Sequence, residues 1–264
     1  MKQLKFMSPG FFRLFFVLFL FINSSVYAQF PSGKGNAPIK TFYNPNKLAK
    51  AVCKNAGSDE EKVKAIYTWI CYHIKYDAKR YTKSSLKRYS SKRILWRKKA
   101  LCDEYTQLFI DMCAAVDIRS FMVDGYFKSS NMEVDDTLYN ADHVWNMVKV
   151  DNKWELVDVT ISAGYLAYKP TILNRIGRIL FVPKKYAKLK YVRHLDTTYF
   201  LSHPDSFVFN HLPSLPEFQN KSEPLSLFDF QDCRQSNCYP SEAQNANAAA
   251  ADDWYQLGFK ERFL

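Results

Sequence analysis

An amphipathic helix, predicted between Ala100 and Ile118, is the feature that most constrains how this chain can fold. Its apolar residues recur three and four positions apart, a spacing that gathers side chains on one helix face: Leu101, Tyr105, Leu108, Phe109, Met112 and Val116. Cys102 stands in the first turn, where the positive end of the helix dipole favours a thiolate. A lone cysteine is more often a small buried apolar residue, so a catalytic role for Cys102 needs partners elsewhere in the chain.

A second helix and a basic loop are predicted before this one. Ser58 and Glu61 have the spacing of a capping box, and apolar residues then recur at helical spacing. We expect this helix to end within residues 73–76. Residues 77–99 are polar and basic and are predicted as a loop that approaches the cysteine, with a short helix near residues 91–96.

After the cysteine helix, the composition changes to short segments rich in β-branched and aromatic residues. They predict strands at residues 120–128, 143–150 and 154–160. Asp151 and Asn152, between the last two, tolerate positive φ, so these strands are predicted to form a hairpin with a two-residue loop. Residues 198–209 are predicted as strand, turn and strand.

The hairpin register predicts which side chains meet. With a two-residue loop Val150 pairs with Lys153, so Asp158 lies opposite Trp145. Side chains alternate along a strand, and His143 therefore points to the same face as Trp145. His143 and Asp158 become diagonal neighbours within side-chain reach. A three-residue loop would place them on opposite faces.

Nucleophilic cysteine chemistry needs a thiolate, a histidine that holds and returns the proton, and a third group that orients the imidazole. Cys102, His143 and Asp158 supply these groups in chain order, from a helix start and two adjacent strands. The other histidines fit this role less well: His73, His194, His203 and His211.

The first 28 residues have the pattern of a secretory signal peptide. Basic residues precede an unbroken run of nine apolar residues from Leu14 to Ile22, and Val26 to Ala28 supplies small residues at a cleavage site. The run is short of the roughly 20 residues that span a bilayer. We expect cleavage after Ala28, export to the periplasm or the extracellular space, and no transmembrane span in the mature chain. An uncleaved anchor is the alternative.

Six cysteines in an exported chain raise the question of disulfides. Cys233 and Cys238 are the best candidates for a local bridge. Cys71 and Cys113 are expected to be buried thiols or to pair with each other or with Cys53. The spacing lacks the paired C-x-x-C or H-x-H pattern of a zinc site, so no metal is predicted. The 8 glycines form neither a P-loop nor a dinucleotide fingerprint, so no cofactor is predicted.

The formal charge of +11 is concentrated in two runs. Residues 62–99 contain 13 lysines and arginines against one acid, and residues 169–193 contain eight and no acid. Such runs are most often solvated surface. The functional alternative is attraction to an anionic envelope polymer, to acidic lipid headgroups or to an acidic protein segment. Nucleic acid is not an expected partner, because no recognised binding motif accompanies the charge and export is predicted.

Charged residues beside the predicted nucleophile act in opposite directions. Asp103 and Glu104 suit the start of a helix but oppose ionisation of the thiol. Arg97, Lys98 and Lys99 would favour the thiolate if they fold over it. The balance depends on where these side chains lie.

Four segments resemble the transglutaminase-like superfamily of papain-type cysteine enzymes: AIYTWICYHIKYD, RKKALCDEYTQLF, DIRSFMVDGYF and DHVWNMVKVDNKWELVDVT. They lie within residues 58–164. Two later segments, YFLSHPDSFVFNHLP and PLSLFDF, resemble the extension of exported members related to kyphoscoliosis peptidase. Two positions depart from the family pattern, since Ala100 and Asp117 stand where glycine is usual.

The resemblance implies Cys102 as nucleophile, His143 as general base and acid, and Asp158 as the residue that orients His143. It implies acyl transfer at an amide of a protein or peptide through a thioester, giving hydrolysis with water or cross-linking with a lysine amine. The implied fold is α+β in the papain-like arrangement, with helices on one side of an antiparallel sheet and the nucleophile at a helix N-terminus.

We therefore expect residues 1–28 to be a signal peptide, 29–57 a lead-in, 58–165 a catalytic core, 166–220 an extension packed on the core and 221–264 a partly low-complexity tail. The leading hypothesis for function is an exported cysteine peptidase, amidase or transglutaminase-like acyltransferase. The alternative is a non-catalytic module that keeps this fold and binds a protein or glycan at the cell envelope.

Overall fold

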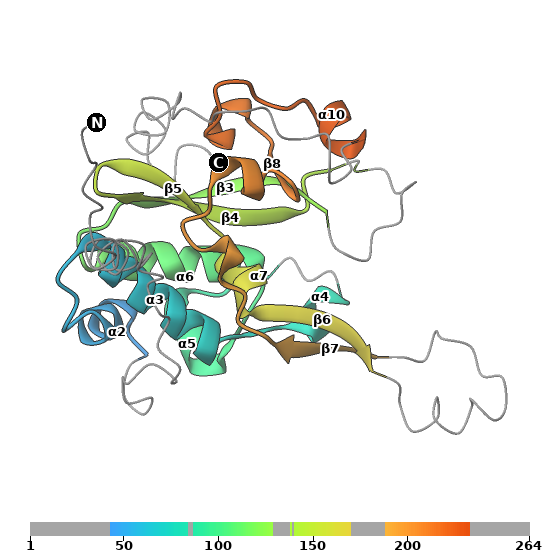
Figure 1. Ribbon diagram of the computed structural model, residues 1–264. Helices are drawn as coiled ribbons and strands as arrows, with labels where there is room; N and C mark the ends of the chain where they lie inside the picture. The colour runs from blue at the N-terminus through green and yellow to red at the C-terminus, as the bar shows by residue number, and fades with distance from the viewer. Residues whose placement is uncertain (1–42, 84–86, 129–137, 139, 170–187, 233–264) are drawn as a thin grey trace, which may run out of the picture. The chain divides into compact units, whose positions relative to one another are not determined.

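The computed structural model of the protein describes residues 43–83, 87–128, 138, 140–169 and 188–232 (Figure 1). These residues all fall within one unit of the chain, residues 33–264. The predicted signal peptide, the bridge predicted between Cys233 and Cys238 and most of the second basic run lie outside the described residues. Within the described ranges, no helix has both the length and the apolar character that crossing a bilayer requires.

An antiparallel sheet of four strands, in the order β5-β4-β3-β8, forms the frame of the fold (Figure 1). The strands are β3 (Ser120–Phe127), β4 (His143–Val150), β5 (Lys153–Val157) and β8 (His211–Pro213). The strand predicted at residues 154–160 ends early, because Asp158 leaves the sheet and caps the short helix α7 (Val159–Ala163). A carboxylate that accepts backbone N–H groups favours a helix start over a further strand residue.

The β4–β5 hairpin has the predicted two-residue loop. Val150 pairs with Lys153, and the register continues to Val157. Asp151 and Asn152 adopt φ of 48° and 65°, the left-handed values that a type I′ turn requires. The predicted register is therefore confirmed.

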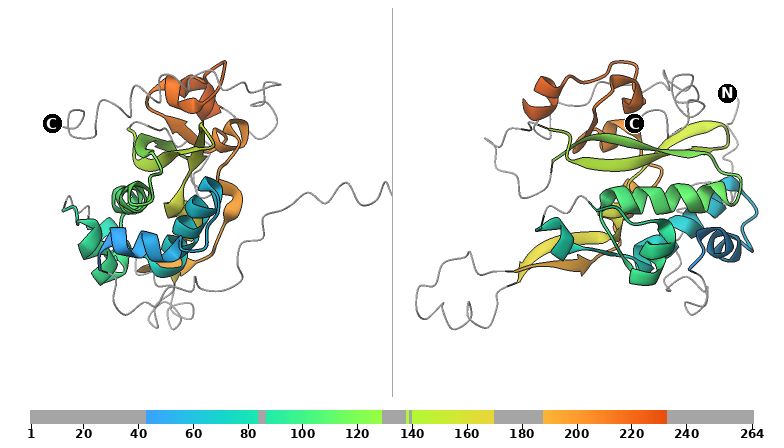
Figure 2. Two further views of the ribbon diagram at one scale, coloured as in Figure 1. Left: turned by 90° about the vertical axis from the view of Figure 1, so that its left-hand side faces the viewer. Right: turned by 180° about the vertical axis from the view of Figure 1, so that it is seen from behind.

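Helices cover one face of the sheet. The helix α6 (Cys102–Ala114) packs on β3 and β4, and further helices pack on α6, among them α2 (Pro45–Val52), α3 (Asp59–His73) and α5 (Ser91–Arg97) (Figures 1 and 2). The predicted inner face of α6 includes the fully buried Leu108, Phe109 and Met112, and burying a side chain of this kind contributes roughly 1.5–3 kcal/mol. The α+β class with helices on one side of an antiparallel sheet is confirmed.

The boundaries of α3 and α6 follow from local chemistry. Ser58 Oγ accepts the Glu61 N–H at 3.2 Å, while the Glu61 carboxylate accepts the N–H of Gly57 at 2.6 Å instead of closing a full capping box on Ser58. After α6, Asp117 adopts a φ of 63°, so an aspartate takes the left-handed conformation that glycine usually supplies.

The C-terminal segment covers the opposite face of the sheet. Phe207 and Phe218 pack into one apolar cluster with the side chains of that face: Phe121, Val123, Trp145, Met147, Trp154 and Leu156. Phe207 lies on α9 (Pro204–Phe207), and Phe218 lies on the 3-10 helix η3 (Pro216–Gln219). The sheet is therefore buried on both faces.

The strand, turn and strand predicted at residues 198–209 is wrong. The segment forms a 3-10 helix, η2 (Thr197–Tyr199), and then α9. Pro204 suits the first turn of a helix, and the His203 side chain caps that turn by accepting the Asp205 N–H. Two of the aromatic residues that suggested strands, Tyr199 and Phe207, instead pack in the apolar cluster on the sheet.

Two smaller strand pairs flank the helices. The parallel pair β1 (Lys75–Tyr76) and β2 (Lys99–Ala100) closes the base of the basic loop, which also carries α4 (Ala78–Tyr81). The antiparallel pair β6 (Gly164–Lys169) and β7 (Lys188–Arg193) has no counterpart among the sequence predictions. The Arg193 guanidinium of β7 donates hydrogen bonds to the carbonyl oxygens of Cys71 and Ile74, which connects the β6–β7 pair to the end of α3.

Gly125 of β3 is needed for the close approach of β8. A Cβ at this position would lie 2.2 Å from the Leu212 carbonyl oxygen and 2.4 Å from Cη2 of Trp145. Neither the strand backbone nor a fully buried indole can move aside cheaply.

We predict that Gly125→Ala destabilises the protein by about 1–3 kcal/mol, the usual cost of overpacking a core. Urea unfolding measures this change. Gly57→Ala is the matched control, because its Cβ would meet only the flexible end of Glu61 at 3.5 Å. Equal stabilities of the two variants would contradict the close approach of β8 to β3.

Candidate active site

Cys102 is the first residue of α6, as the sequence predicts. The preceding N–H, of Leu101, donates to Glu104 Oε2 at 3.0 Å and fixes the start of the helix. Cys102 is a partly exposed residue, and its thiol forms no disulfide. A reactive cysteine has this combination of helix N-terminus, access and free sulfur.

The other cysteines in the described part of the chain are buried free thiols: Cys53, Cys71 and Cys113. The sequence left open whether these three cysteines pair in disulfides, and in the structure all three are unpaired. Burial raises the pKa of Cys53 to about 11 and the pKa of Cys71 and Cys113 well above the ordinary value. Thiols with raised pKa stay protonated and inert at neutral pH, so Cys102 stands apart from this group by its exposure.

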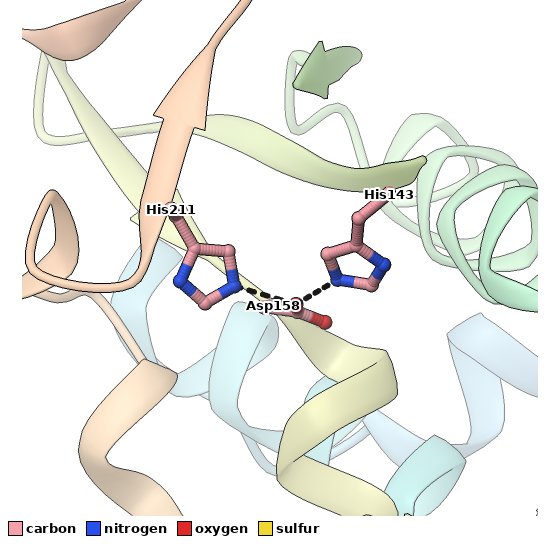
Figure 3. Close-up of side chains that lie close together, drawn as sticks. All are labelled: His143, Asp158 and His211. Atoms are coloured by element: carbon pink, nitrogen blue, oxygen red, sulfur yellow. Dashed lines mark hydrogen bonds and ion pairs between the residues drawn. The ribbon is translucent and has the colours of Figure 1, made fainter. Parts of the chain in front are cut away.

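His143 begins β4, and its side chain meets Asp158 (Figure 3). The Nε2 atom of His143 lies 2.6 Å from Asp158 Oδ2. Burial lowers the pKa of His143, but the charge and hydrogen bond of Asp158, followed by contributions from Cys102, outweigh burial and raise it to about 10. His143 is therefore an imidazolium at neutral pH. Because Nε2 faces Asp158, Nδ1 is the nitrogen left for Cys102.

The Asp158 carboxylate is fully buried and ionised. Its Oδ1 accepts the N–H groups of Thr160 at 2.7 Å and Ile161 at 3.0 Å, and its Oδ2 faces His143. Burial alone would raise the pKa of Asp158, but the positive charge and hydrogen bond of His143, with the hydrogen bond of His211, hold it well below the ordinary value. This carboxylate therefore orients His143 and keeps its charge.

His211 is a member of this site that the sequence does not reveal. Its Nε2 lies 3.0 Å from the same Oδ2 of Asp158, on the side opposite His143 (Figure 3). Burial lowers the pKa of His211 to about 4, so this imidazole is neutral at neutral pH. No local motif marks His211, because it lies 53 positions from Asp158, just after the segment 198–209 whose elements are predicted wrongly.

These three side chains are of types that bind metal ions, and one ligand atom from each lies within 4.8 Å of the others. The sequence predicts no metal site. The separations of 2.6 and 3.0 Å between the imidazole nitrogens and the carboxylate are hydrogen bonds, which place a proton where a metal would need a lone pair. The arrangement therefore fits proton handling better than metal binding.

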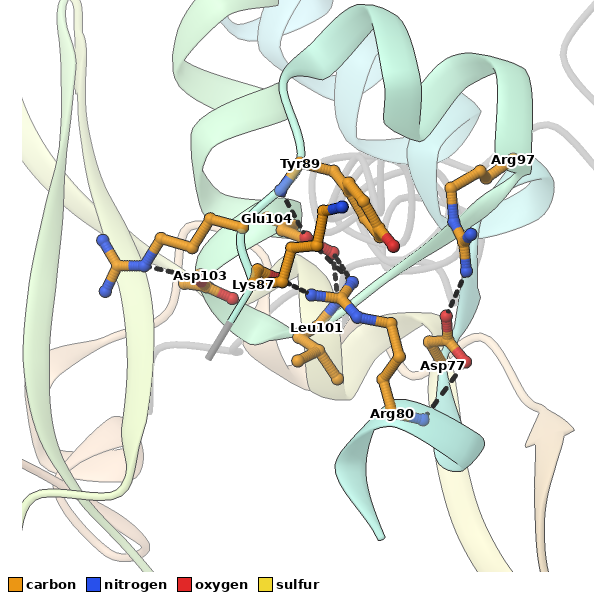
Figure 4. Close-up of polar contacts among 9 residues, drawn as sticks. Asp77, Arg80, Lys87, Tyr89, Arg97, Leu101, Asp103 and Glu104 are labelled. Carbon is orange, nitrogen blue, oxygen red and sulfur yellow. Dashed lines mark hydrogen bonds and ion pairs between the residues drawn. The ribbon is translucent and has the colours of Figure 1, made fainter. Parts of the chain in front are cut away.

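Each acidic residue next to Cys102 has an arginine partner (Figure 4). Arg88 Nε lies 3.0 Å from Asp103 Oδ2, and Arg80 Nη1 lies 2.7 Å from Glu104 Oε2. These pairs offset the negative charge beside the thiol. Two of the three basic residues expected to do so have other partners: Arg97 binds Asp77 at 2.8 Å, and Lys98 lies 5.0 Å from the centre of the Trp69 ring. The third, Lys99, is exposed.

Glu104 also ties the basic loop to the start of α6 (Figure 4). Its buried carboxylate accepts from Arg80 Nη1, from the Tyr89 N–H at 2.7 Å and from the Leu101 N–H at 3.0 Å. The Arg80 guanidinium donates in addition to the Lys87 carbonyl oxygen and lies 4.3 Å from the centre of the Tyr89 ring. These contacts therefore hold the basic loop against the start of α6.

Comparison with known proteins relates this part of the chain to one family. Residues 46–159 match the profile of the transglutaminase-like superfamily. Kyphoscoliosis peptidase of Mus musculus is 29% identical over 207 residues, which cover 78% of this chain and 28% of the mouse protein. The similarity to a transglutaminase-like domain thus extends over residues 46–159. Cys102, His143 and Asp158 lie within this domain, and His211 lies beyond it.

Two further similarities accompany the transglutaminase-like domain. Hillarin of Drosophila melanogaster is 25% identical over 197 residues, which cover 73% of this chain and 22% of hillarin. A solved structure from Cytophaga hutchinsonii, described as a proposed cysteine protease, is 22% identical with a TM-score of 0.35, covering 44% of this chain and 36% of that chain. The chain spans about a quarter of the length of the curated relatives it matches.

We predict that Glu104→Gln costs about 3–5 kcal/mol of stability, because it leaves the largely buried Arg80 without its counter-charge. Urea unfolding measures the loss. Asp59→Asn is the control, since it removes one partner of the exposed Lys62–Asp59 pair and should cost less than about 1 kcal/mol. A similar loss in both variants would argue against the buried pair.

A second prediction concerns pH. The pKa of His143 is raised in the folded protein, so its contribution to stability is complete below the unfolded value of about 6.5 and is lost as the pH rises through about 10. The free energy of unfolding should fall across this window in the wild type and fall less in His143→Gln. His203→Gln, at an exposed histidine, should follow the wild type. Parallel pH profiles for all three proteins would refute the charged pair.

Proposed function

We propose that this protein is a cysteine-dependent acyl-transfer enzyme that acts on amide bonds of a protein or peptide through a thioester on Cys102. The observation that carries the proposal is the 2.6 Å contact between His143 and a buried, ionised Asp158, which leaves Nδ1 of the imidazolium for the thiol at the start of α6. A protein or peptide substrate fits the peptidase named among the relatives.

In the first step, Cys102 Sγ attacks the carbonyl carbon of the amide as a thiolate, its charge balanced by the His143 imidazolium. The Nδ1 proton of His143 passes to the leaving nitrogen, the C–N bond breaks and an acyl thioester remains. Asp158 keeps its charge throughout and holds the imidazole in the orientation that presents Nδ1.

In the second step, the now neutral His143 takes a proton from the acceptor. Water or an amine attacks the thioester carbonyl, the C–S bond breaks, and the thiolate and imidazolium are restored. Water gives hydrolysis, and a lysine amine gives a cross-link. The first N–H groups of a helix have no intrahelical acceptor, so the backbone N–H of Cys102 is available to stabilise the oxyanion of both steps.

Two features outside the site extend the proposal. The signal-peptide pattern in residues 1–28 supports export to the periplasm or the extracellular space. The excess of basic residues supports attraction to an anionic envelope polymer. In the first basic run, Arg80, Arg88 and Arg97 are already paired with acids, so the lysines carry most of that attraction.

The central experiment replaces the thiol. We predict that Cys102→Ala lowers hydrolysis of fluorescein-labelled casein, or incorporation of dansylcadaverine into casein, by about 10⁴-fold or more, the scale of losing a nucleophile. Cys113→Ala is the control, because it removes a buried thiol from the same helix and should keep its activity at a temperature where it stays folded. Two results together would instead favour the non-catalytic binding module. The wild type would turn over casein no faster than Cys102→Ala, and iodoacetamide would alkylate Cys102 no faster than it alkylates free cysteine.

A further inference from the structure

We infer that His211 is a positioning residue of this site: its Nε2–H donates to Asp158 Oδ2 and fixes the oxygen that binds His143. The inference rests on the proposed function and deepens it, because it adds a fourth side chain to the three that the family resemblance implies. This side chain comes from β8, outside the transglutaminase-like domain.

The first argument is the number of donors around Asp158. An ionised carboxylate has about four lone-pair sites. The two on Oδ1 are used by the N–H groups of Thr160 and Ile161, and the two on Oδ2 by His143 at 2.6 Å and His211 at 3.0 Å. Without His211, a fully buried charge would lose one of four donors, and no water could easily replace it.

The second argument is the proton on His211. A neutral imidazole has one N–H, and Asp158 can only accept, so that proton lies on Nε2. Nδ1 is then an acceptor, and the Asn210 atom placed 2.7 Å from it is the amide oxygen Oδ1, which also accepts. Amide oxygen and nitrogen are assigned from their hydrogen bonds, and this pairing calls for the amide to be turned over. The Asn210 nitrogen then donates to Nδ1, and the Tyr199 hydroxyl, which lies 2.7 Å from the placed nitrogen, donates to the amide oxygen that takes its position. A continuous chain of donors therefore leads from Tyr199 to Asp158.

The third argument is the rigid setting of the His211 ring. It stacks on Phe207 with ring centroids 4.2 Å apart. Trp145 lies edge-on to it with centroids 5.1 Å apart, and the tilted ring of Phe127 has its centroid 4.8 Å away. The ring is fully buried. A side chain packed in this way cannot turn to another partner, so it holds Asp158 Oδ2 in one place.

The test compares His211→Phe with His211→Gln. Phenylalanine keeps the stacking on Phe207 and lacks the donor, whereas the glutamine amide nitrogen reaches the position of Nε2 and restores it. We expect His211→Phe to lower kcat for labelled casein about 10- to 100-fold with KM nearly unchanged, the range typical of an orienting partner, and His211→Gln to recover most of the loss. His194→Phe, at an exposed histidine whose ring contact with Tyr165 phenylalanine can keep, should behave as wild type.

A second measurement follows the His143 Nε2 proton by NMR, which reports its bond to Asp158 whether or not the protein turns over substrate. We expect this resonance to shift or broaden in His211→Phe and to return in His211→Gln. An unchanged resonance in a folded His211→Phe overturns the inference. If the resonance changes in His211→Phe but the wild type processes no amide, the positioning role is upheld and the proposed function is rejected. Failure of the inference and failure of the proposed function are therefore distinguishable.

Discussion

The buried charge of Asp158 is the constraint on which the rest of the structure depends. An ionised carboxylate without solvent is tolerated only if donors surround it, and here they come from three elements: the start of α7, the first residue of β4 and the first residue of β8. Each element must therefore end or begin at a particular residue. The early end of β5 and the position of the C-terminal segment both follow from this requirement.

The same constraint explains why the sheet is covered on both faces. Helix α6 brings Cys102 to one side, while the C-terminal segment brings His211 and its aromatic neighbours to the other. The absent side chain of Gly125 lets β8 and Trp145 come close enough for this arrangement. Packing and chemistry thus depend on the same few contacts.

Local sequence carries much of this architecture. The loop of Asp151 and Asn152 fixes the hairpin register, and that register brings His143 and Asp158 together. Helical periodicity likewise predicts the buried face of α6. These features are predictable because turn chemistry and side-chain alternation act over a few residues.

Other features depend on contacts between distant residues. His211 acquires its role only because β8 pairs with β3, and nothing in its own neighbourhood signals that pairing. The aromatic residues around α9 suggest strands, because periodicity cannot distinguish a short strand from a short helix packed on a sheet. The arginine partners of Asp103 and Glu104 come from a loop whose path periodicity does not predict.

The attachment of the basic loop to Glu104 has a consequence for how proteins of this kind can diversify. Strands β1 and β2 pair at the base of the loop. The Glu104 carboxylate accepts the Tyr89 N–H within the loop and the Leu101 N–H at the start of α6. A loop transplanted from a relative would disturb the thiol unless it brought its own equivalent of Arg80. Relatives can therefore exchange this loop only where the Arg80–Glu104 ion pair is preserved. Exposed positions such as Tyr81 stay open to substitution.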